Sequence, residues 1–405
     1  MKRMSILSGV LLALLTVTVV LAQSSLPGNG WWSGQQVQNV GTGTATIQIV
    51  AYDKDNPTNT YQSSVSVDPG DAYTFTPFTG LTNLPDGFMG SAVVSSDQPI
   101  KAIVNVTNLQ AGDLGAAGGK AAAQYQGIDS SGVGSTVYFP LAKGDYWGAT
   151  TTYYIQNAGT SAASLQAVFT MRTGATYTYS SPTLADNQMV VFSIFDTSYT
   201  APGVTGDDGR VGSMVATSTE PLAGVVMEHL TTANPALYVQ GTRGFTSADF
   251  DTKAYAPVVK NTYYGRFSGL QVQNVSGGPI DITVQYKGVD GPCSGSTLSE
   301  SATSVADGTS HTFVQLGAVG PLGVGCLASA SIEGTGNFVA IVNEVALNGS
   351  AGITYYAVPD AAATMKVSAP LFKDNFWGGT SGMQIQNVGT SAASSIVATF
   401  SCTAQ

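Results

Sequence analysis

Short stretches in which apolar and polar residues alternate recur along the whole chain. TATIQIVAY at 44–52 and IDITVQYKG at 280–288 put their apolar side chains on one face, which is typical of a half-buried β-strand. Similar strands are expected at SVSV, AYTF, MVVFSIF and KAIVNV, separated by polar turns such as DKDNPTN at 53–59. No stretch after residue 22 keeps a helical period for three turns. The pattern therefore predicts an all-β protein.

Three sequence signatures recur in a fixed order. An aromatic pair leads into a strand that ends in Gln-Asn, as in WWSGQQVQNVGT, YWGATTTYYIQNAGT, YYGRFSGLQVQNVSG and FWGGTSGMQIQNVGT. A second signature, GSAVVSSDQPIKAIVNV at 90–106, is answered by GSMVATSTEPLAGVVMEHL at 212–230 and, more loosely, by CLASASIEGTGNFVAIVNEV at 326–345. The third is a Pro-x-x-Lys strand, found as YFPLAK, YAPVVK and SAPLFK with Lys143, Lys260 and Lys373. A common interval of about 115 residues predicts tandem repeats.

The size of one repeat predicts its architecture. A block of about 115 residues with short strands throughout matches an immunoglobulin-like or jelly-roll β-sandwich. Residues 1–22 resemble a signal peptide, and only a few residues separate it from Trp31. We therefore expect the Pro-x-x-Lys strand to close each repeat rather than open it. The predicted β-sandwich repeats are 31–143, 146–260 and 263–373, and 376–405 is an incomplete fourth repeat. Alternatively, the Pro-x-x-Lys strand pairs with the next strand in a hairpin, which moves the boundaries to near 135, 250 and 365.

The segments between the repeats are short. Two residues separate each lysine from the next aromatic pair, so we expect a stiff rod of sandwiches. The fourth repeat would carry opening strands without closing ones, which leaves strand edges exposed. Two explanations fit: the sequence is a fragment of a longer protein, or this segment completes a neighbouring chain by strand addition.

The N-terminus and the charge balance point to an exported protein. Residues 1–22 have a basic start, an apolar run and a small-residue end, as a signal peptide does, although an uncleaved N-terminal anchor is the alternative. No later stretch is long and apolar enough for a membrane span. The formal net charge is −10 with only 15 Lys and Arg residues, which argues against nucleic-acid and anionic-lipid partners. We therefore expect a secreted, extracellular or cell-surface location.

Cysteine placement fits an oxidising compartment. Cys293 and Cys326 lie in the third repeat and are expected to form its disulfide. Cys402 lies in the fourth repeat and is expected to have its partner elsewhere.

The aromatic pairs are the candidate contact residues. Flat rings stack on sugars, but they also fill junctions between domains, and both interpretations stay open. Because neighbouring residues of a strand point to opposite faces, at most one ring of each pair is expected to enter a core. The candidate residues for ligand or inter-domain contact are Trp31, Trp32, Tyr146, Trp147, Tyr263, Tyr264, Phe376 and Trp377.

The other polar signatures suggest structure rather than chemistry. Asn-x-Gly-Thr predicts a turn in which Asn bonds the local backbone and Gly takes a positive φ. The repeated lysines suggest protection of an edge strand, with an ion pair between repeats as the alternative. Two acidic loops, Asp53-Lys-Asp55-Asn56 and Asp207-Asp208, could hold Ca²⁺ weakly but do not fit a calcium-binding spacing.

Nothing in the sequence predicts catalysis. His229 and His311 are the only histidines, neither has a zinc-binding spacing, and no G-x-S-x-G motif occurs. Glu228 and His229 are neighbours on a strand and should point to opposite faces. We expect a protein that is not an enzyme and that needs no cofactor.

The order of these signatures resembles tandem β-sandwich repeats of large, mostly uncharacterised secreted or cell-surface bacterial proteins. The resemblance covers 31–405 and implies no activity, cofactor or catalytic residue. In the third repeat, Glu333-Gly-Thr-Gly replaces the Pro-containing turn, which puts the hairpin expected there in doubt.

The expected function is that of a secreted, non-enzymatic structural or adhesive repeat protein, acting as a stiff stalk or an interaction scaffold. Its partners would be cell-wall or extracellular polysaccharide, or other surface proteins. The alternative is a carbohydrate-binding repeat array, forming the N-terminal part of a secreted glycoside-degrading enzyme.

Overall fold

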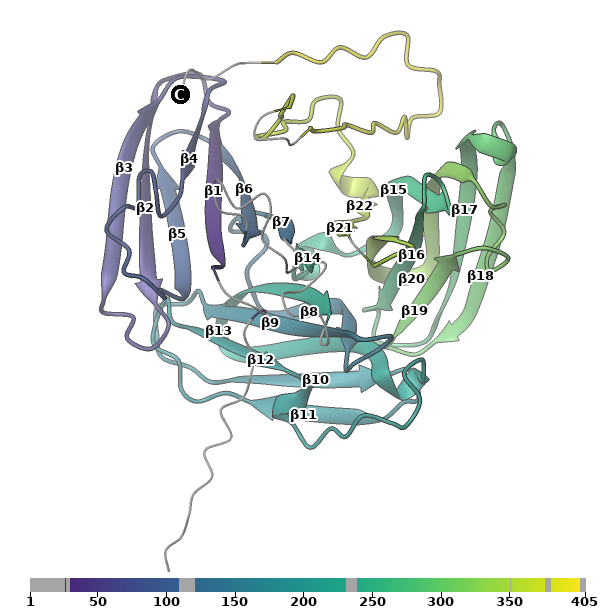
Figure 1. Ribbon diagram of the computed structural model, residues 1–405, viewed down its shortest axis with the longest axis horizontal. Coiled ribbons are helices and arrows are strands. Elements are labelled where there is room, and N and C mark those ends of the chain that lie inside the picture. Colours follow the sequence, from purple (N-terminus) through teal and green to yellow (C-terminus); the bar gives the residue numbers. More distant parts are fainter. Residues whose placement is uncertain are drawn as a thin grey trace, which may run out of the picture.

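The structure is a computed structural model that describes residues 26, 30–108, 121–230, 239–349, 351–375 and 380–400. It consists of antiparallel sheets, with only three-residue 3-10 turns as helical elements among the described residues (Figure 1). The all-β prediction is therefore confirmed. The predicted signal peptide at 1–22 lies outside the described residues.

The strands fall into three sandwiches along the chain. Sandwich 1 contains β1 (Trp32–Asn39), β2 (Ala45–Asp53), β3 (Thr60–Val67), β4 (Ala72–Phe75), β5 (Gly90–Ser96), β6 (Ile100–Thr107) and β7 (Ala122–Gln126). Sandwich 2 contains β8 (Gly134–Lys143), β9 (Ala149–Asn157), β10 (Leu165–Met171), β11 (Thr176–Ser180), β12 (Met189–Ser193), β13 (Val211–Leu230) and β14 (Val239–Arg243). Sandwich 3 contains β15 (Asp251–Asn261), β16 (Arg266–Asn274), β17 (Ile280–Asp290), β18 (Thr297–Val305), β19 (Ser310–Gln315), β20 (Cys326–Ala346), β21 (Gly352–Tyr356) and β22 (Val358–Pro359). The 3-10 turns are η1 (Ile194–Asp196), η2 (Asp208–Arg210), η3 (Ser247–Asp249), η4 (Gly291–Cys293) and η5 (Asp360–Ala362).

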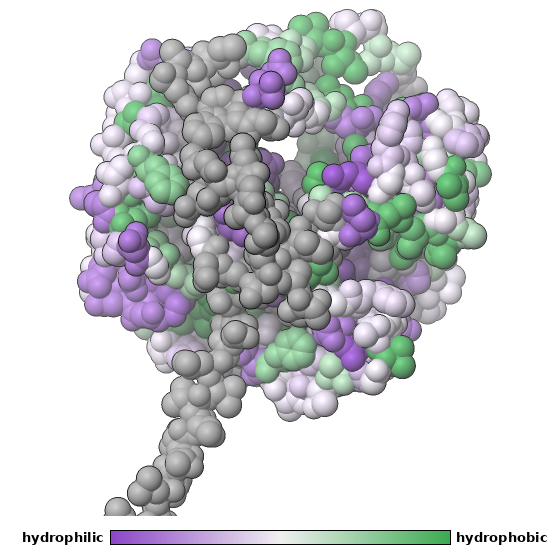
Figure 2. All heavy atoms as spheres, in the orientation of Figure 1, coloured by the Kyte–Doolittle hydropathy of each residue, from purple (hydrophilic) through white to green (hydrophobic). Residues whose placement is uncertain are grey.

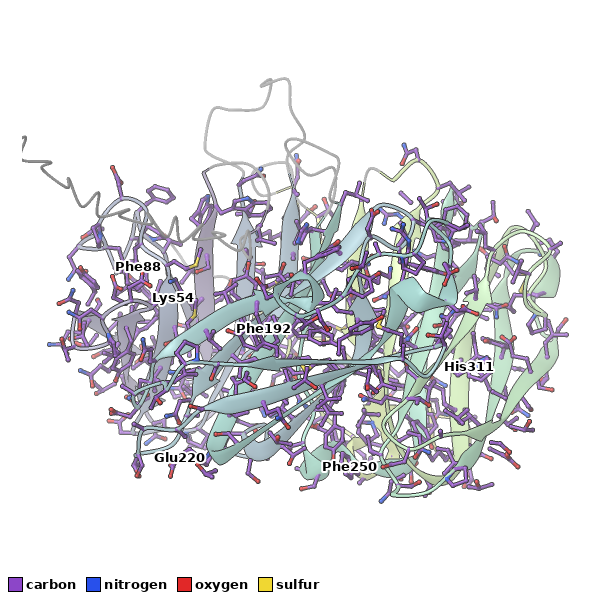
Figure 3. The ribbon with its side chains drawn as sticks, turned by 90° about the horizontal axis from the view of Figure 1, so that it is seen from below. Lys54, Phe88, Phe192, Glu220, Phe250 and His311 are labelled. Atoms are coloured by element: carbon purple, nitrogen blue, oxygen red, sulfur yellow. A yellow bond between two sulfur atoms is a disulfide. The ribbon has the colours of Figure 1, made fainter. Side chains whose placement is uncertain are left out.

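Each sandwich has two sheets that enclose a core. In sandwich 1 the sheets have the strand orders β3-β2-β5 and β4-β1-β6-β7. The predicted alternation is confirmed in β2, where Ala45, Ile47 and Ile49 are buried and the residues between them are exposed. They meet Val37 of β1 and Phe75 of β4 from the other sheet. Sandwiches 2 and 3 have larger cores of the same kind, and Figure 3 labels Phe192 in the second core.

One long strand belongs to both sheets in sandwiches 2 and 3. The first part of β13 pairs with β8 and β10, and its second part, from Leu222 on, pairs with β9 and β14. The register shifts between Thr217 and Leu222, at the Glu-Pro corner. β20 likewise passes from one sheet to the other near Gly334, where its partner changes from β17 to β16. In sandwich 1 two separate strands, β5 and β6, take the place of this long crossing strand. The expected hairpin at this signature is therefore wrong, because the chain turns a corner between layers instead of reversing.

The predicted repeat boundaries need a correction. The Pro-x-x-Lys strand does not close a repeat, because β8 pairs with β13 and β15 pairs with β20, both later in the chain. Thus 134–143 belongs with the strands after it, and so does 251–261. The boundaries fall near those of the alternative, although the partner is the long crossing strand and not the next strand in a hairpin.

The three sandwiches surround a shared centre, so the expected rod is wrong. β7, β14 and β21 hold the same edge position in their sheets, and they contact one another in the middle of the molecule (Figure 1). An apolar cluster that includes Ala123, Met227 and Val239 joins sandwiches 1 and 2. A second, with Leu141, Phe245, Val339 and Ile341, joins sandwiches 2 and 3. Short linkers limited the swing of the sandwiches, but burial of these apolar edges sets their direction.

Both junctions also share polar contacts. Ser91 Oγ donates a hydrogen bond to Asn187 O at 2.7 Å between sandwiches 1 and 2, and Ser213 Oγ donates to Gly308 O at 2.6 Å between sandwiches 2 and 3. Both serines follow the glycine that opens the second signature. The repeated sequence therefore encodes a repeated junction.

The C-terminal segment adds no strand to these sheets, although Gln386 Nε2 donates a hydrogen bond to Ala330 O of β20 at 3.4 Å. Residues 363–375 and 380–400 contain no strand and are mostly exposed. Residues 376–379 and 401–405, with the expected contact residues Phe376 and Trp377 and with Cys402, lie outside the described part of the chain. Strands of an incomplete fourth sandwich are thus not present in the described segment.

The structure joins Cys293 and Cys326 in a disulfide whose Cα atoms are 5.7 Å apart. It ties η4 to the start of β20. The backbones approach closely here, since a Cβ on Gly291, which has φ +76°, would lie 2.1 Å from Gly325 O.

Reduction of this disulfide should destabilise sandwich 3. A cross-link that closes a loop of 33 residues contributes about 3–4 kcal/mol in the chain-entropy model. We expect a reductant to lower the melting temperature measured by calorimetry. A Cys293→Ser/Cys326→Ser variant should start from the lower value and ignore the reductant, and an unchanged melting temperature in reduced wild type would contradict the expectation.

Candidate functional site

A buried asparagine ends one strand in each sandwich: Asn39 ends β1, Asn157 ends β9 and Asn274 ends β16. Asn157 Nδ2 donates to Ser161 O at 2.8 Å and to Leu184 O at 3.2 Å, while its Oδ1 accepts from Gly159 N at 3.0 Å. Asn39 and Asn274 repeat these local bonds and also donate to a carbonyl at the end of β3 or β18. The local half of this pattern recurs at Asn387 in the C-terminal segment.

The structure confirms one half of the turn prediction and corrects the other. The asparagines bond the local backbone as predicted. The glycine two residues later does not take a positive φ at Gly41 or Gly159; only in the third copy does a glycine, Gly277, have φ +82°. The side-chain bonds already fix the turn, so left-handed backbone is not required.

Two of the three repeated lysines, Lys143 and Lys260, form largely buried ion pairs. Lys143 Nζ lies 2.8 Å from Glu228 Oε1, and Lys260 Nζ lies 3.0 Å from Glu344 Oε2. Each lysine lies in the last two residues of the strand that opens a sandwich, β8 or β15, and each glutamate lies on the second half of β13 or β20. The pair therefore links the two layers of one sandwich. The expected edge protection is not their principal contact.

The glutamates were missed as partners in the sequence. Their signal was present, because GVVMEHL and AIVNEV carry Glu at matching places of the second signature. Sandwich 1 has Val106 at this place, and no described residue supplies a lysine strand to it. Lysine strand and glutamate thus occur together or not at all among the described sandwiches.

Two of the aromatic pairs lie in tight turns and not in strands. Tyr146 and Ala149 exchange backbone hydrogen bonds of 2.9 and 3.0 Å around Trp147-Gly148, which have φ of +51° and +79°. A two-residue turn of this type normally has Asn or Gly first, because a side chain in left-handed backbone costs about 1–2 kcal/mol. Strain of this kind often marks a functional position.

The second ring of each turn is exposed. Trp147 is 70% exposed and Tyr264 is 88% exposed. Tyr264, with φ +48°, and Gly265, with φ +71°, repeat the turn between the bridged residues Tyr263 and Arg266. The sequence thus uses strained backbone twice to hold an aromatic ring outward.

The first ring of each pair faces inward or sideways. Tyr146 packs on the cluster between sandwiches 2 and 3, with Lys143 Nζ 5.9 Å from its ring centre. Tyr263 Oη donates to Asp290 Oδ2 at 2.6 Å, which raises the pKa of Tyr263 to about 12 and lowers that of Asp290. Arg210, itself buried, holds Asp145 at the first turn with an ion pair of 2.6 Å.

The first aromatic pair differs from these turns. Trp31 packs on the cluster between sandwiches 1 and 2, and Trp32 begins β1. The Trp32 ring meets the exposed Phe78 edge-on at 5.4 Å. The structure therefore does not bring the aromatic pairs together in one place.

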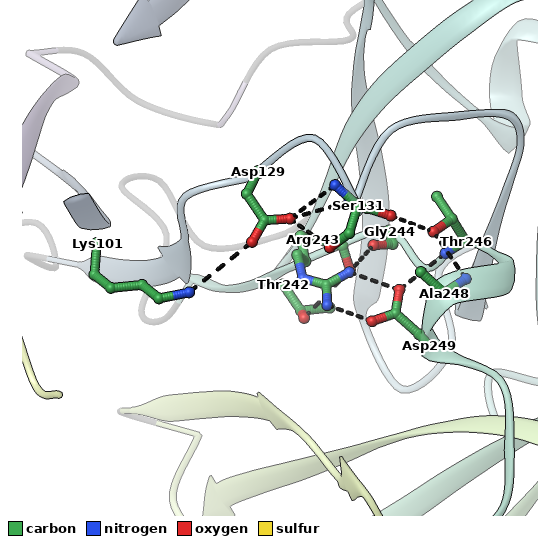
Figure 4. Close-up of polar contacts among 10 residues, drawn as sticks. Lys101, Asp129, Ser131, Thr242, Arg243, Gly244, Thr246, Ala248 and Asp249 are labelled. Carbon is green, nitrogen blue, oxygen red and sulfur yellow. Dashed lines mark hydrogen bonds and ion pairs between the residues drawn. The ribbon is translucent and has the colours of Figure 1, made fainter. Parts of the chain in front are cut away.

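An arginine site at the junctions was not predicted. Arg243 Nη1 lies 2.9 Å from Asp249 Oδ2 (Figure 4). Its guanidinium also lies over Phe245 and Tyr356, 5.4 Å from the centre of the Tyr356 ring. Thr246 Oγ1 beside it donates to Ser131 O at 2.7 Å, in the segment that follows sandwich 1. Arg243 of sandwich 2 thus contacts Tyr356 of sandwich 3, and the neighbouring Thr246 contacts the segment after sandwich 1, so this stretch supports the centre of the assembly.

The remaining candidates have structural partners. Asp53 Oδ1 accepts from Asp55 N and Asn56 N, Asp207 caps η2, and Asp208 pairs with Arg172 at 3.1 Å. Within the described ranges, no group of three or more His, Cys, Asp or Glu side chains could hold a metal ion.

The two histidines lie in different sandwiches. His229 Nε2 lies 3.0 Å from Thr152 Oγ1, while Glu228 points to Lys143, so the two neighbours face opposite sides as expected. Burial lowers the pKa of His229, and burial together with the charge of Arg172 lowers that of His311, which Figure 3 labels in the third sandwich.

The described residues form one shallow feature on the outer surface of sandwich 2. An open depression of about 380 Å³ lies over Ser164, Leu165, Gln166, Ser180, Thr217, Ser218 and Thr219, none of which is titratable. Polar and apolar residues are interspersed over the face in Figure 2. Among the described residues, no helix has the length and apolar character to cross a membrane. The chain matches no protein-family model, and no curated protein matches it.

The lysine–glutamate pair allows a stability test. Lys143→Met alone leaves a buried carboxylate without its cation, which should cost about 3–5 kcal/mol in unfolding free energy. Lys143→Met/Glu228→Gln removes both charges and should recover most of that loss. Denaturant unfolding measures both, and a double variant no more stable than the single one would contradict the assignment.

The histidines predict a pH dependence. A histidine whose pKa is lower in the folded state is held neutral there, so the unfolded state binds more protons once the pH falls below about 6.5. Stability should therefore be full above pH 7 and fall towards pH 5. In a His229→Gln/His311→Gln variant the melting temperature should change less over this window; an equal slope would show that other groups titrate.

Proposed function

We propose that this chain is an exported, non-enzymatic adhesive scaffold, built from immunoglobulin-like or jelly-roll sandwiches that pack into one body. Its task is to present exposed aromatic turns to an extracellular partner, either a polysaccharide or another surface protein. The exposed rings of Trp147 and Tyr264 carry this proposal, because both are held outward by the same strained turn.

The packing supports a scaffold and not a stalk. Junction clusters and repeated serine contacts fix the sandwiches against one another, so the two turns keep a set spacing and direction. A partner with a repeating surface could engage both turns at once, which raises the overall affinity. The disulfide and the acidic, low-charge composition suit a secreted or cell-surface location.

A carbohydrate-binding array is the second candidate, as one part of a secreted glycoside-degrading enzyme. The exposed indole of Trp147 favours it, since flat rings at a surface stack on sugar faces. The indole stays 70% exposed although a neighbouring loop touches it: Trp147 N donates to Thr205 O at 2.9 Å, and the ring lies against Gly206.

Substitution by glycine separates binding from folding. Trp147→Gly/Tyr264→Gly removes both rings yet keeps turns that glycine adopts without strain, so the melting temperature should stay within a few degrees. We expect the wild type to be retained on bacterial envelope material and the variant to lose at least ten-fold in affinity. Phe195→Ala, which removes another exposed ring, is the matched control.

The type of target decides between the two candidates. Retention on purified polysaccharide that the glycine variant loses would favour the carbohydrate array. Retention on envelope protein alone would favour the scaffold. Equal retention of wild type and glycine variant would show that the aromatic turns are not the contact.

A further inference from the structure

Sandwich 1 lacks a strand that the other two possess. Its first sheet has the order β3-β2-β5, whereas the matching sheets continue past the crossing strand to β8 in sandwich 2 and to β15 in sandwich 3. Among the described residues β5 pairs with β2 and with no strand on its other side. An unpaired edge is a template for another strand.

The burial of β5 agrees with an incomplete sheet. Every residue of β5 is at least partly exposed, and Val93 is 40% exposed, whereas the first four residues of β13 are buried. Ala92 and Val94 face the core but are only half-buried. Their counterparts, Met214 and Ala216, are fully buried in sandwich 2, where β8 pairs with β13 in the sheet.

The chain contains a further copy of the strand that fills this position. YFPLAK lies in β8 and YAPVVK in β15, and the third copy is SAPLFK at 368–373. In the structure this segment has no strand pairing. It carries the sequence of a sheet strand without a sheet.

The apolar residues of this copy fall at the core-facing positions. Val137, Phe139 and Ala142 of β8 enter the core of sandwich 2. The corresponding residues of the third copy are Val367, Ala369 and Phe372. All three are exposed here, Val367 by 66% and Phe372 by 42%, although Phe372 touches the Phe400 ring.

We propose that the open edge of β5 is a strand-acceptor site, and that the segment 367–373 of a second copy of this chain occupies it as an added antiparallel strand. The protein would then assemble head to tail. This inference does not depend on the proposed adhesive function.

The register follows from sandwich 2. There Met214 lies opposite Phe139, Val215 opposite Tyr138 and Ala216 opposite Val137. Transferred to the acceptor edge, Ala92 faces Ala369, Val93 faces Ser368 and Val94 faces Val367. Two core-facing pairs and one outward pair result, as the alternation of a strand requires.

A second copy fits better than the same chain. The segment leaves sandwich 3 at Ala361, whose N–H donates to Asp251 Oδ2 at 2.9 Å, and Asp360 is bonded to Tyr255 of β15. Six residues then reach Val367, and they span at most about 20 Å. Figure 1 places β5 and β15 in sandwiches on opposite sides of the molecule.

The association should be weaker than the covalent arrangement. Sandwich 1 has Val106 where Glu228 holds Lys143, so Lys373 would gain no ion pair. An added strand that gains ladder hydrogen bonds and apolar burial without that pair should bind reversibly, so assembly should depend on protein concentration.

Cysteine cross-linking between separately tagged chains tests the register. One variant carries Val93→Cys and the other Ser368→Cys, both in a Cys402→Ser background, because directly opposite residues lie about 5 Å apart at Cβ. Mild oxidation should give a mixed-tag dimer. Ser64→Cys, an exposed residue on the opposite edge strand β3, is the matched control and should give at least ten-fold less.

Sedimentation provides a measurement without cross-linking. The wild type should shift to larger species as its concentration rises, and a synthetic peptide of residues 365–374 should reverse the shift. Phe372→Asp should abolish association, whereas Met365→Asp, at a fully exposed residue outside the strand copy, should not. A wild type that stays monomeric and binds no peptide would overturn the proposal. So would a Val93→Cys/Ser368→Cys chain that cross-links only within itself.

Discussion

Each sandwich depends on one buried asparagine side chain that joins its two layers. A side-chain amide both donates and accepts, and Asn39, Asn157 and Asn274 use theirs to bond a turn beside one sheet and a carbonyl beside the other. Sheet packing alone is not directional and would let the layers slide. These bonds define where one layer starts relative to the other. The long strands β13 and β20, and the lysine strands β8 and β15 that pair with them, are then placed relative to both layers.

The strands and the local turn chemistry were predictable from the sequence. Alternation identified β2 and β17, and the Asn-x-Gly pattern identified the bonded turn, because both depend on residues close together in the chain. The left-handed aromatic turns were not predictable in this way. Trp147 and Tyr264 precede glycine, but aromatic residues usually avoid such backbone, and strand placement was the more natural expectation.

The boundaries and the overall shape could not be predicted for a different reason. A repeated sequence shows how long one repeat is but not at which residue each repeat begins, so the start has to be inferred from an end of the chain. The short stretch before Trp31 led to the wrong starting residue. That inference required sandwich 1 to have all its strands, but its first sheet has only three among the described residues. The ion pair between Lys143 and Glu228 shows the correct boundary, because the two residues belong to one sandwich. The shape depends on edge residues such as Val239 and Ile341, whose burial between sandwiches no local pattern distinguishes from burial within one.

The continuous course of β13 and β20 through both layers has a mechanical meaning. In a sandwich whose layers are joined only by loops, tension can peel one sheet from the other a strand at a time. Here a single extended backbone is hydrogen-bonded into both sheets, so pulling on one layer loads the ladders of the other in shear. Many bonds must then break together. A protein under tension gains rupture resistance from this path without added cross-links.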